Sequence, residues 1–381
     1  MGMFVVMMGI VATLVAGVVS VRCTMGLTGP MWIKIGLFLG LFFIFMSPAL
    51  LRGAEMRLTG LPYHILTYTT YFLFVCLFLF FCLMFVRDIG WGLLSLLSHR
   101  IPSPFAPTAV ARANIALTLV VVVLAAWSLW EGTRVPAVRH ITLTSDKITA
   151  PLTVAVLPDI HIHRAVAAQK LKGLVARTRD ENPDVILLPG DIIDDRADAI
   201  RNLLPYLGQF QAPLGVFVSD GNHEFYIGTR ETQAGFRAEH LTYLNNEARF
   251  IRPDVRIAGV PDVQGFRFHQ GPDMRATLPP TDAYTILLAH SPKMFDMPDN
   301  TADLQVSGHT HGGQIFPFHL LAAWSNKYLA GLYRKGERTL YVSRGAGQWG
   351  PQMRLLAPSE ITIIHLHPGT NHGSRDRQHT R

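Results

Sequence analysis

The stretch Gly308–Gln314, with the sequence Gly-His-Thr-His-Gly-Gly-Gln, places two histidines two residues apart in front of paired glycines. At an extended strand end, side chains at positions i and i+2 point the same way, so we expect His309 and His311 to face one pocket. The glycines allow the backbone to pass close to whatever lies there. A His-x-His pair also occurs on solvated strands, so the stretch must be interpreted together with similar clusters earlier in the chain.

Five polar clusters each follow an apolar, strand-like run. They are Asp159 with His161, Asp191 with Asp194, Asn222 with His223, His290 alone, and His309 with His311. Each cluster by itself is compatible with an ordinary turn or a helix start, because Gly-Asp and Gly-Asn pairs are common in turns. Five of them at the ends of successive strands favour one shared site, since open α/β sheets place their sites at the carboxyl ends of strands.

From about residue 150 the chain alternates between short apolar runs and helix-like segments. The predicted strands are Thr153–Leu157, Val185–Leu188, Gly215–Val218, Val255–Val260, Ala283–Leu288, Leu304–Ser307, Thr339–Val342 and Ile361–His365. The predicted helices are Val166–Arg179, Ala197–Leu207 and Glu231–Leu244. The β-α-β-α-β order of the first half predicts a parallel sheet, and the strand-rich second half predicts a second sheet packed on it.

The first third of the chain contains four apolar runs, each about long enough to cross a bilayer of roughly 30 Å as a helix. They are residues 3–21, 31–51, 64–86 and 113–130. Short polar breaks separate the runs, so we predict a four-helix transmembrane module over residues 1–135 rather than buried soluble helices. Residues 131–150 are expected to be a linker, and residues 368–381 a disordered tail.

Net charge and cysteine usage narrow the class of protein. The formal net charge of +7 comes from the membrane flanks and the tail, because residues 150–365 carry 21 Lys and Arg against 22 Asp and Glu. A nucleic-acid-binding basic face is therefore not expected. Cys23, Cys76 and Cys82 all lie in or beside apolar runs, so the rest of the chain has no cysteine for a disulfide or a zinc site.

The residue types in the clusters indicate a metal site. Carboxylates, imidazoles and an amide oxygen, without thiolates, suit divalent or trivalent ions such as Mn, Fe or Zn. The candidate ligands are too many for one tetrahedral ion, and two ions about 3.5–4 Å apart form a clamp for in-line phosphoryl transfer. A carboxylate bridges two cations best, and Asp191 is the expected bridge.

Taken in order, Asp-x-His, Gly-Asp-x-x-Asp, Gly-Asn-His-Glu, a single His and Gly-His-x-His resemble the calcineurin-like metallophosphoesterase superfamily, in particular its bacterial membrane-associated members. The resemblance covers residues 153–366 and implies a four-layer α-β-β-α sandwich over residues 150–367. It implies two metal ions, one held by Asp159, His161, Asp191 and His311, and the other by Asp191, Asn222, His290 and His309.

The resemblance also implies roles for residues outside the ligand set. His223, oriented by Asp194, would act as general acid or stabilise the transition state, and Arg344 and Arg354 would contact the substrate. Glu224 stands where many members have Asp. His163 matches no metal position and is interpreted as a surface residue.

The implied activity is that of a membrane-bound dimetal phosphoesterase, which hydrolyses phosphomonoester, phosphodiester or lipid-linked pyrophosphate bonds with metal-activated hydroxide. Its expected partners are membrane lipids and the phosphoester, and no nucleic acid. The alternative is a non-catalytic membrane scaffold or transporter that retains the metal-binding domain. The presence of His223 and Asp194 argues against the scaffold, and the lack of Asp, Glu or Arg in mid-span argues against an ion-coupled transporter.

The expected location is the bacterial cytoplasmic membrane, with several spans. Under the positive-inside rule, the two sides tie at five basic residues each when the residues after the last span are included. Counting only the loops between spans gives five against two, which favours an extracytoplasmic domain. Four spans are more than an anchor needs, and the linker after them is short. The substrate is therefore expected at or in the membrane.

Overall fold

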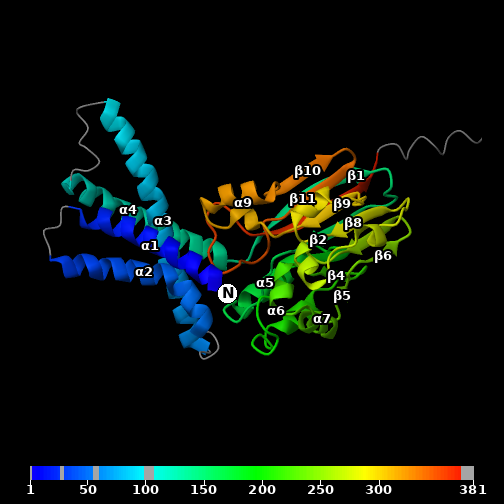
Figure 1. The fold of residues 1–381 in the computed structure, drawn as a ribbon. Helices are drawn as coiled ribbons and strands as arrows, with labels where there is room; N and C mark the ends of the chain where they lie inside the picture. Colours follow the sequence, from blue (N-terminus) through cyan, green and yellow to red (C-terminus); the bar gives the residue numbers. More distant parts are fainter. Residues whose placement is uncertain (1, 26–29, 55–59, 98–106, 370–381) are drawn as a thin grey trace, which may run out of the picture. The chain divides into compact units, whose positions relative to one another are not determined.

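The computed structural model describes residues 2–25, 30–54, 60–97 and 107–369, which form two compact units (Figure 1). The first unit contains Met1–Trp130 and Gly350–Met353, and the second contains Glu131–Trp349 and Arg354–Arg381. Most of the predicted tail, residues 370–381, lies outside the described residues.

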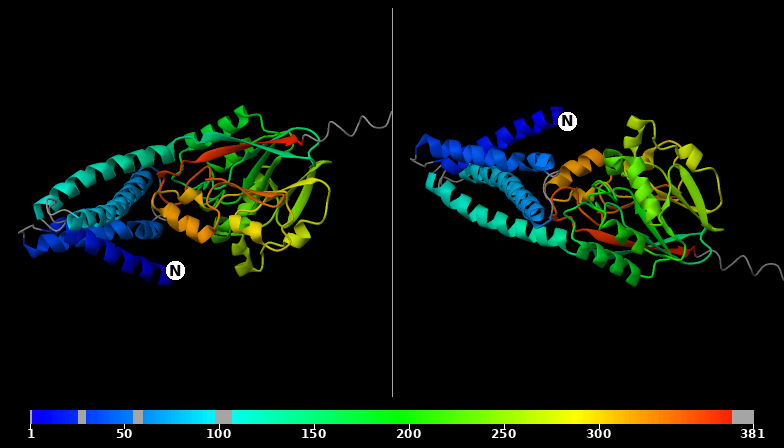
Figure 2. Two further views of the ribbon diagram at one scale, coloured as in Figure 1. Left: turned by 90° about the horizontal axis from the view of Figure 1, so that it is seen from above. Right: turned by 90° about the horizontal axis from the view of Figure 1, so that it is seen from below.

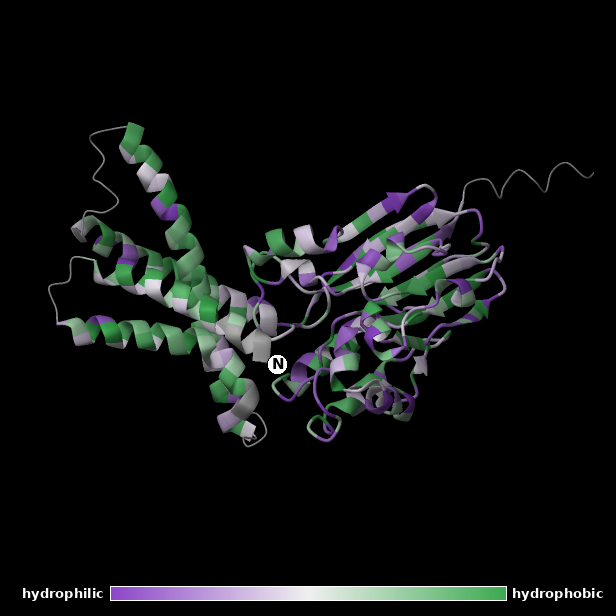
Figure 3. Ribbon diagram, in the orientation of Figure 1, coloured by the Kyte–Doolittle hydropathy of each residue, from purple (hydrophilic) through white to green (hydrophobic). Residues whose placement is uncertain are grey.

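The described part of the first unit is helical and apolar, as its hydropathy colouring shows (Figure 3). Its helices are α1 (Gly2–Thr24), α2 (Met31–Ala54), α3 (Gly60–Leu97) and α4 (Pro107–Thr133), of which the last turn of α4 belongs to the second unit. Three segments, Met31–Leu51, Gly60–Leu97 and Thr108–Thr133, are long and apolar enough to cross a membrane, whereas the apolar segment Gly9–Thr24 is shorter. A fourth span stays a prediction.

Helix α3 does not end at residue 86, where the predicted span ends, but continues to Leu97. The polar residues Arg87 and Asp88 that suggested a break pair with each other, and Asp88 also forms an ion pair of 2.6 Å with Arg22 of α1. Paired charges of this kind are compatible with a helix interior, so they do not interrupt α3.

The second unit contains two six-stranded mixed sheets, seen from two further sides in Figure 2. The first has the order β1 (Ala137–Ser145), β12 (Glu360–Pro368), β2 (Leu152–Val156), β3 (Val185–Pro189), β4 (Val216–Ser219) and β5 (Thr242–Tyr243). The second has the order β10 (Gly331–Lys335), β11 (Arg338–Val342), β9 (Leu304–Ser307), β8 (Tyr284–Leu288), β7 (Val255–Gly259) and β6 (Glu247–Arg252). In the first sheet β2, β3 and β4 are parallel neighbours, and in the second β7, β8 and β9 are.

Short helices complete this unit. They are α5 (Ala168–Asp180), η1 (Leu204–Gln209), α6 (Asn222–Ile227), α7 (Thr229–Ala238), η2 (Val263–Phe268), α8 (Met274–Thr277), η3 (Pro292–Asp296), η4 (His311–Gly313) and α9 (Phe318–Asn326). Val154 and Leu187 of the first sheet pack with Ile257, Ile286 and Val306 of the second in one buried cluster. The two sheets therefore share a core, as expected for an α/β sandwich in which β-branched side chains fill the pleated faces.

The structure corrects three predictions of local structure. Residues 131–150 are not a plain linker, because β1 lies there and pairs in parallel with β12. Residues 197–207 form turns and then the short helix η1, since Pro205 has no backbone N–H and restricts the residue before it. The helix predicted over residues 231–244 ends at Ala238, because Thr242 and Tyr243 pair with β4 as strand β5.

Candidate metal centre

The first sheet brings three of the predicted clusters together at the carboxyl ends of neighbouring strands. Asp159 and His161 follow β2, Asp191 and Asp194 follow β3, and Asn222 and His223 follow β4 at the start of α6. Parallel strands end at the same edge of a sheet, so the sequence order of the clusters becomes spatial proximity. Asp159, His161 and Asp191 adopt the left-handed backbone region, with φ of 56°, 49° and 54°. Such strain in residues other than glycine is typical of functional sites.

The second sheet contributes the remaining histidines in the same way. His290 follows β8, and His309 and His311 follow β9, again with positive φ of 71° and 51° for the last two. The residue before them has to be glycine, because a Cβ on Gly308 would lie 2.3 Å from Oδ2 of Asp159. The positive φ angles of His309 and His311 and the missing side chain of Gly308 thus allow this stretch to lie against Asp159, which follows a strand of the first sheet.

Side chains from both sheets form clusters that could each hold a metal ion, and one further cluster, of His161, Asp194 and His223, crosses the predicted ligand sets. Asp159, His161 and His311 offer ligand atoms within 4.8 Å of one another, and so do Asp191, His290 and His309. Asn222 joins the second cluster, since its Oδ1 lies 2.8 Å from Nδ1 of His309.

Asp191 lies between the two clusters. Its Oδ2 is 3.1 Å from Nε2 of His290 in one cluster and 3.7 Å from Nε2 of His161 in the other. Its other carboxylate oxygen, Oδ1, accepts a hydrogen bond from the backbone N–H of His223 at 2.8 Å. Asp191 therefore has the position expected of a bridging carboxylate.

His290 tests whether these residues fit a cation. Its Nδ1 lies 2.9 Å from the Pro189 carbonyl oxygen, so Nδ1 carries the proton and donates it. Nε2 is buried and lies 3.1 Å from Oδ2 of Asp191 and 3.9 Å from Oδ1 of Asp159. Burial lowers the pKa of His290, but these carboxylates outweigh burial and raise the pKa well above its ordinary value. The same negative field that attracts a proton attracts a metal ion, so the residues fit one.

The imidazoles of His309 and His311 are ready to act as ligands. Burial, reinforced by neighbouring histidines, lowers the pKa of His309 to about 4 and that of His311 well below its ordinary value. Neutral imidazole is the form that binds a metal ion. Oxygen and nitrogen donors without sulfur suit divalent metal ions.

His223 and Asp194 form a pair beside the clusters. Oδ1 of Asp194 lies 2.5 Å from Nδ1 of His223 and fixes the orientation of the ring. Burial alone would lower the pKa of His223, but Asp191 and Asp194 raise it to about 9. A cation bound to Asp191 would compensate part of that negative charge. Without a bound cation, His223 therefore holds its proton at neutral pH.

The two arginines predicted to contact substrate differ in position. Arg354 is fully buried and donates to the carbonyl oxygens of His311, at 2.9 Å, and Gly347. It supports the metal-site loop and is not exposed to a substrate, which corrects the prediction. Arg344 is half-buried, pairs with Glu360 at 3.1 Å, and stays a candidate for substrate contact.

His163 was interpreted as a surface residue, but it is half-buried. Burial lowers its pKa to about 4, and its Nδ1 accepts a hydrogen bond from the backbone N–H of Ala165. It therefore helps to shape the loop after His161.

Two functional candidates were missed by the sequence reasoning. Glu224 is fully buried and accepts four backbone N–H groups, those of Gly221, Asp191, Ile192 and Ile193. Asp262 follows β7, is buried, and its Oδ2 has no hydrogen-bond partner. Asp262 had a detectable signal, because it follows a proline after an apolar strand, as Asp159 does. Glu224 belongs to the Gly-Asn-His-Glu motif, but its role was not predicted, since its four partners become neighbours only when two loops meet.

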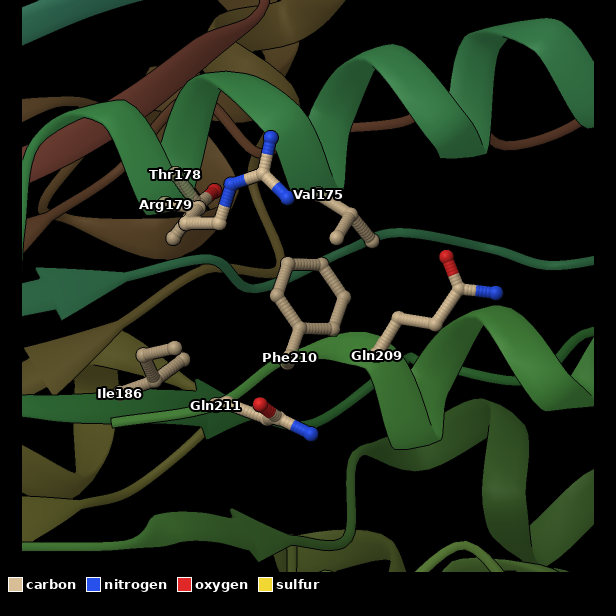
Figure 4. A pocket seen from close by; sticks show the side chains of 7 residues that line it. All are labelled: Val175, Thr178, Arg179, Ile186, Gln209, Phe210 and Gln211. Carbon is tan, nitrogen blue, oxygen red and sulfur yellow. The ribbon is translucent and has the colours of Figure 1, made fainter. Parts of the chain in front are cut away.

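A hollow elsewhere on the second unit contains none of the predicted site residues (Figure 4). Val175, Thr178 and Arg179 of α5 line one side, and Phe210, after η1, lies opposite. These residues do not form a cluster of metal ligands or nucleophiles. The candidate site is therefore the one at the strand ends.

Comparison with known proteins gives consistent results. Residues 152–313 match the family model described as calcineurin-like phosphoesterase. An uncharacterized metallophosphoesterase of Campylobacter jejuni is 34% identical over 260 residues, which cover 66% of this chain and 69% of that protein. A relative from Helicobacter pylori is also 34% identical, and this chain spans 66% of its length.

A transmembrane protein with metallophosphoesterase domain from Bos taurus is 31% identical over 329 residues, which cover 80% of this chain and 74% of that protein. Among solved structures, a 5'-nucleotidase precursor from Thermus thermophilus aligns with a TM-score of 0.34 and 15% identity. That alignment covers 57% of this chain and 54% of the other.

Proposed function

Because the chain belongs to the calcineurin-like phosphoesterase family, we propose that it is a membrane-bound dimetal hydrolase of phosphoester or pyrophosphate bonds whose substrate is at or in the membrane. One observation carries the proposal of hydrolysis. The carboxylate of Asp191 lies between two ligand clusters, and its Oδ2 is 4.0 Å from Nε2 of His223, whose Nδ1 contacts Asp194. The proposal includes four membrane spans and a four-layer sandwich.

The residues divide the work of the reaction. One ion would be held by Asp159, His161 and His311, and the other by His290, His309 and Asn222. Asp191 would contribute to both sites. When bound, two such ions lower the pKa of a shared water and neutralise charge on the phosphoryl oxygens. His223 holds a proton for the leaving oxygen, and Asp194 keeps the ring oriented through Nδ1. This proton transfer would contribute roughly 10²–10⁴ in rate.

The membrane part of the proposal rests on chain connectivity. The segment Thr108–Thr133 is a candidate span, and the compact catalytic unit begins at Glu131, within the last turn of the same helix. A site tethered so close to a bilayer meets lipid-linked phosphates at high effective concentration. The loop charges favour an extracytoplasmic catalytic unit in a bacterial cytoplasmic membrane, and protease protection in spheroplasts tests that side.

The deciding experiment uses full-length protein in lipid nanodiscs, loaded with Mn²⁺, and a panel of phosphomonoesters, phosphodiesters and lipid pyrophosphates. Phosphate release should be measurable for at least one class and absent in Asp191→Asn, whose neutral amide cannot bind two cations as strongly. Higher kcat/KM for the lipid-linked member of a matched pair supports the membrane substrate. Full metal loading without turnover of any class would instead indicate the non-catalytic scaffold.

A further inference from the structure

Helix α9 has its polarity reversed for a helix of a water-exposed domain. Its bulky apolar side chains point outward: Trp324 is 85% exposed, Leu320 63% and Leu321 57%. The small residues Ala322 and Ala323 are the more covered ones, and no residue of α9 is buried. A helix that packs on a core shows the opposite arrangement. Exposed large side chains concentrated on one short helix mark a surface that contacts another phase or partner.

The helix lies beside the metal centre. It begins five residues after Gly313, the last residue of η4, and it packs against η4, which includes His311. Gln314, between η4 and α9, binds the backbone of Trp349 in both directions, with its amide donating at 2.8 Å and its carbonyl accepting at 3.1 Å. The Trp349 ring is in turn 6.2 Å from the ring of His223. Helix α9 therefore adjoins η4 and, through Gln314, the loop that carries Trp349 beside His223.

A further exposed apolar residue, Leu356, follows a segment that pairs with the chain just before α9. Leu356 is 78% exposed and directly follows Leu355, whose backbone pairs with Gln314 and Phe316 just before α9. We call α9 and Leu356 together the apolar rim.

Chain connectivity identifies what covers the apolar rim. Gly132, in the last turn of a candidate span, accepts hydrogen bonds through its carbonyl oxygen from Lys170, at 2.7 Å, and from Gln348, at 2.5 Å. Gln348 immediately precedes Trp349 of the site rim. Trp130, two residues before Gly132, is half-exposed and packs on Trp127, and paired tryptophans at a span end are typical of the lipid–water interface. The loop that carries Trp349 is thus held at the last turn of the candidate span, through Gln348 and Gly132.

We propose that α9 is an interfacial membrane helix, which places Leu320, Leu321 and Trp324 at the boundary between headgroups and acyl chains and so faces the metal centre toward lipid phosphates. The part concerning lipid phosphates rests on the proposed function, whereas the insertion of α9 does not. A bilayer fits better than a protein partner. A stable protein interface buries roughly 800 Å² of surface on each partner, and the surface that one nine-residue helix and Leu356 can offer is much smaller. Short helices with Trp, Phe and Leu on one face are typical of interfacial elements.

The first test measures insertion by fluorescence. Full-length protein with Cys23→Ala, Cys76→Ala and Cys82→Ala receives Leu321→Cys, labelled with the fluorophore NBD, in nanodiscs of phosphatidylcholine and phosphatidylglycerol. The matched control is Phe250→Cys, since Phe250 is a similarly exposed residue, 60%, on β6 at the opposite edge of the second sheet from β10. Doxyl-labelled lipid should quench the Leu321 label by about half or more and the Phe250 label by less than about a tenth.

Two results would overturn the insertion of α9. Equal quenching of both labels would mean that the helix has no preferred contact with lipid. A blue-shifted Leu321 label that lipid does not quench would mean that protein, including a second copy of this chain, covers the apolar rim.

The second test concerns substrate access. Leu320→Gln combined with Trp324→Gln should leave kcat/KM for a soluble phosphoester within about twofold and lower it about tenfold for the matched lipid-linked one, because tethering acts on effective concentration. An equal loss on both substrates would remove α9 from substrate access. If neither substrate is hydrolysed by the unmodified protein, the proposed function fails, while the quenching result still decides the position of α9.

Discussion

The two halves of the metal centre are supported by buried charges of opposite sign. On the side of the first sheet, the Glu224 carboxylate collects four backbone N–H groups from the loops after β3 and β4. On the side of the second sheet, the Arg354 guanidinium donates to backbone carbonyls of the loops around His311. Both side chains are fully buried.

The difference shows how each loop is built. The loops after β3 and β4 turn their N–H groups inward, which forms a nest for an anion. The loops after β9 and β11 turn carbonyl oxygens of His311, Gly347 and Ala357 toward the Arg354 guanidinium, a cation. A buried charge without partners is very costly, so either residue is tolerated only while its loop keeps this shape. Glu224 therefore stabilises the loop that carries Asp191, Arg354 stabilises the loop that carries His311, and the following changes separate the two.

Glu224→Gln should have the largest effect. The amide NH₂ group would face backbone N–H groups that lose their acceptor, at about 1–3 kcal/mol for each unsatisfied group. Since these N–H groups position Asp191, which touches both clusters, metal analysis should show loss of both ions, with activity at background and a lower Tm. Glu231→Gln is the matched control, because Glu231 accepts one backbone N–H, that of Ala197, at 3.0 Å. Two retained ions with near-normal turnover would contradict the supporting role.

His223→Ala should lower the catalytic rate without releasing either metal ion. Both ions should stay bound, while kcat falls by roughly 10²–10⁴ on substrates with poor leaving groups and by less on those whose leaving group needs no proton. Asp194→Asn serves as the comparison, since it keeps the ring but loses the carboxylate that orients it. Equal losses on good and poor leaving groups would exclude His223 as the acid.

Arg354→Met should weaken the binding of one of the two metal ions only. The carbonyl oxygens around His311 would lose their donors, and we expect the affinity for one ion to fall about 10–100-fold, as for other groups that orient metal ligands. A calorimetric Mn²⁺ titration should show one weakened step and one unchanged step, and saturating metal should restore much of the activity. Arg338→Met is the matched control, because Arg338 also donates to two carbonyl oxygens, those of Phe295 and Asn300. Equal weakening of both steps would show that the halves are not supported separately.

Asp296→Asn should have the smallest effect, because its charge contacts lie at the surface. Hydrogen bonds from Lys327 and Lys335 lower the pKa of Asp296 to about 2. A lowered pKa in the folded state contributes stability above the ordinary pKa of about 4 that is lost as the pH falls toward 2. The contribution should stay below about 1 kcal/mol and shrink in high salt. Chemical unfolding of the unmodified protein and of the variant at pH 7 and pH 3 measures the difference in their free energies of unfolding. A larger difference at pH 3 than at pH 7 would contradict the expected sign.

Much of the centre was predictable from sequence because its ligands obey a local rule. Asp159, Asp191, Asn222, His290 and His309 each follow an apolar run that becomes a strand, and neighbouring parallel strands end at one edge. The predicted sheets and ligand clusters follow from that rule. The helix predicted over residues 197–207 failed for a local reason too, namely Pro205.

Other features depended on partners far away in the chain. Strand β1 was treated as a linker because its partner β12 lies more than 200 residues later. Arg354 was expected to reach substrate because a sequence does not show whether an arginine will be enclosed by its own loop. The apolar residues of α9 have a spacing that also suits a core helix, and the tertiary structure leaves them exposed.

The sequence by itself determined the types of candidate metal ligand and the strand ends at which they lie, because residue type and backbone periodicity are local properties. The tertiary structure decided which buried charges shape the loops and which apolar residues stay outside. Those outcomes depend on the free energy of burial, and burial is settled only when distant segments pack together.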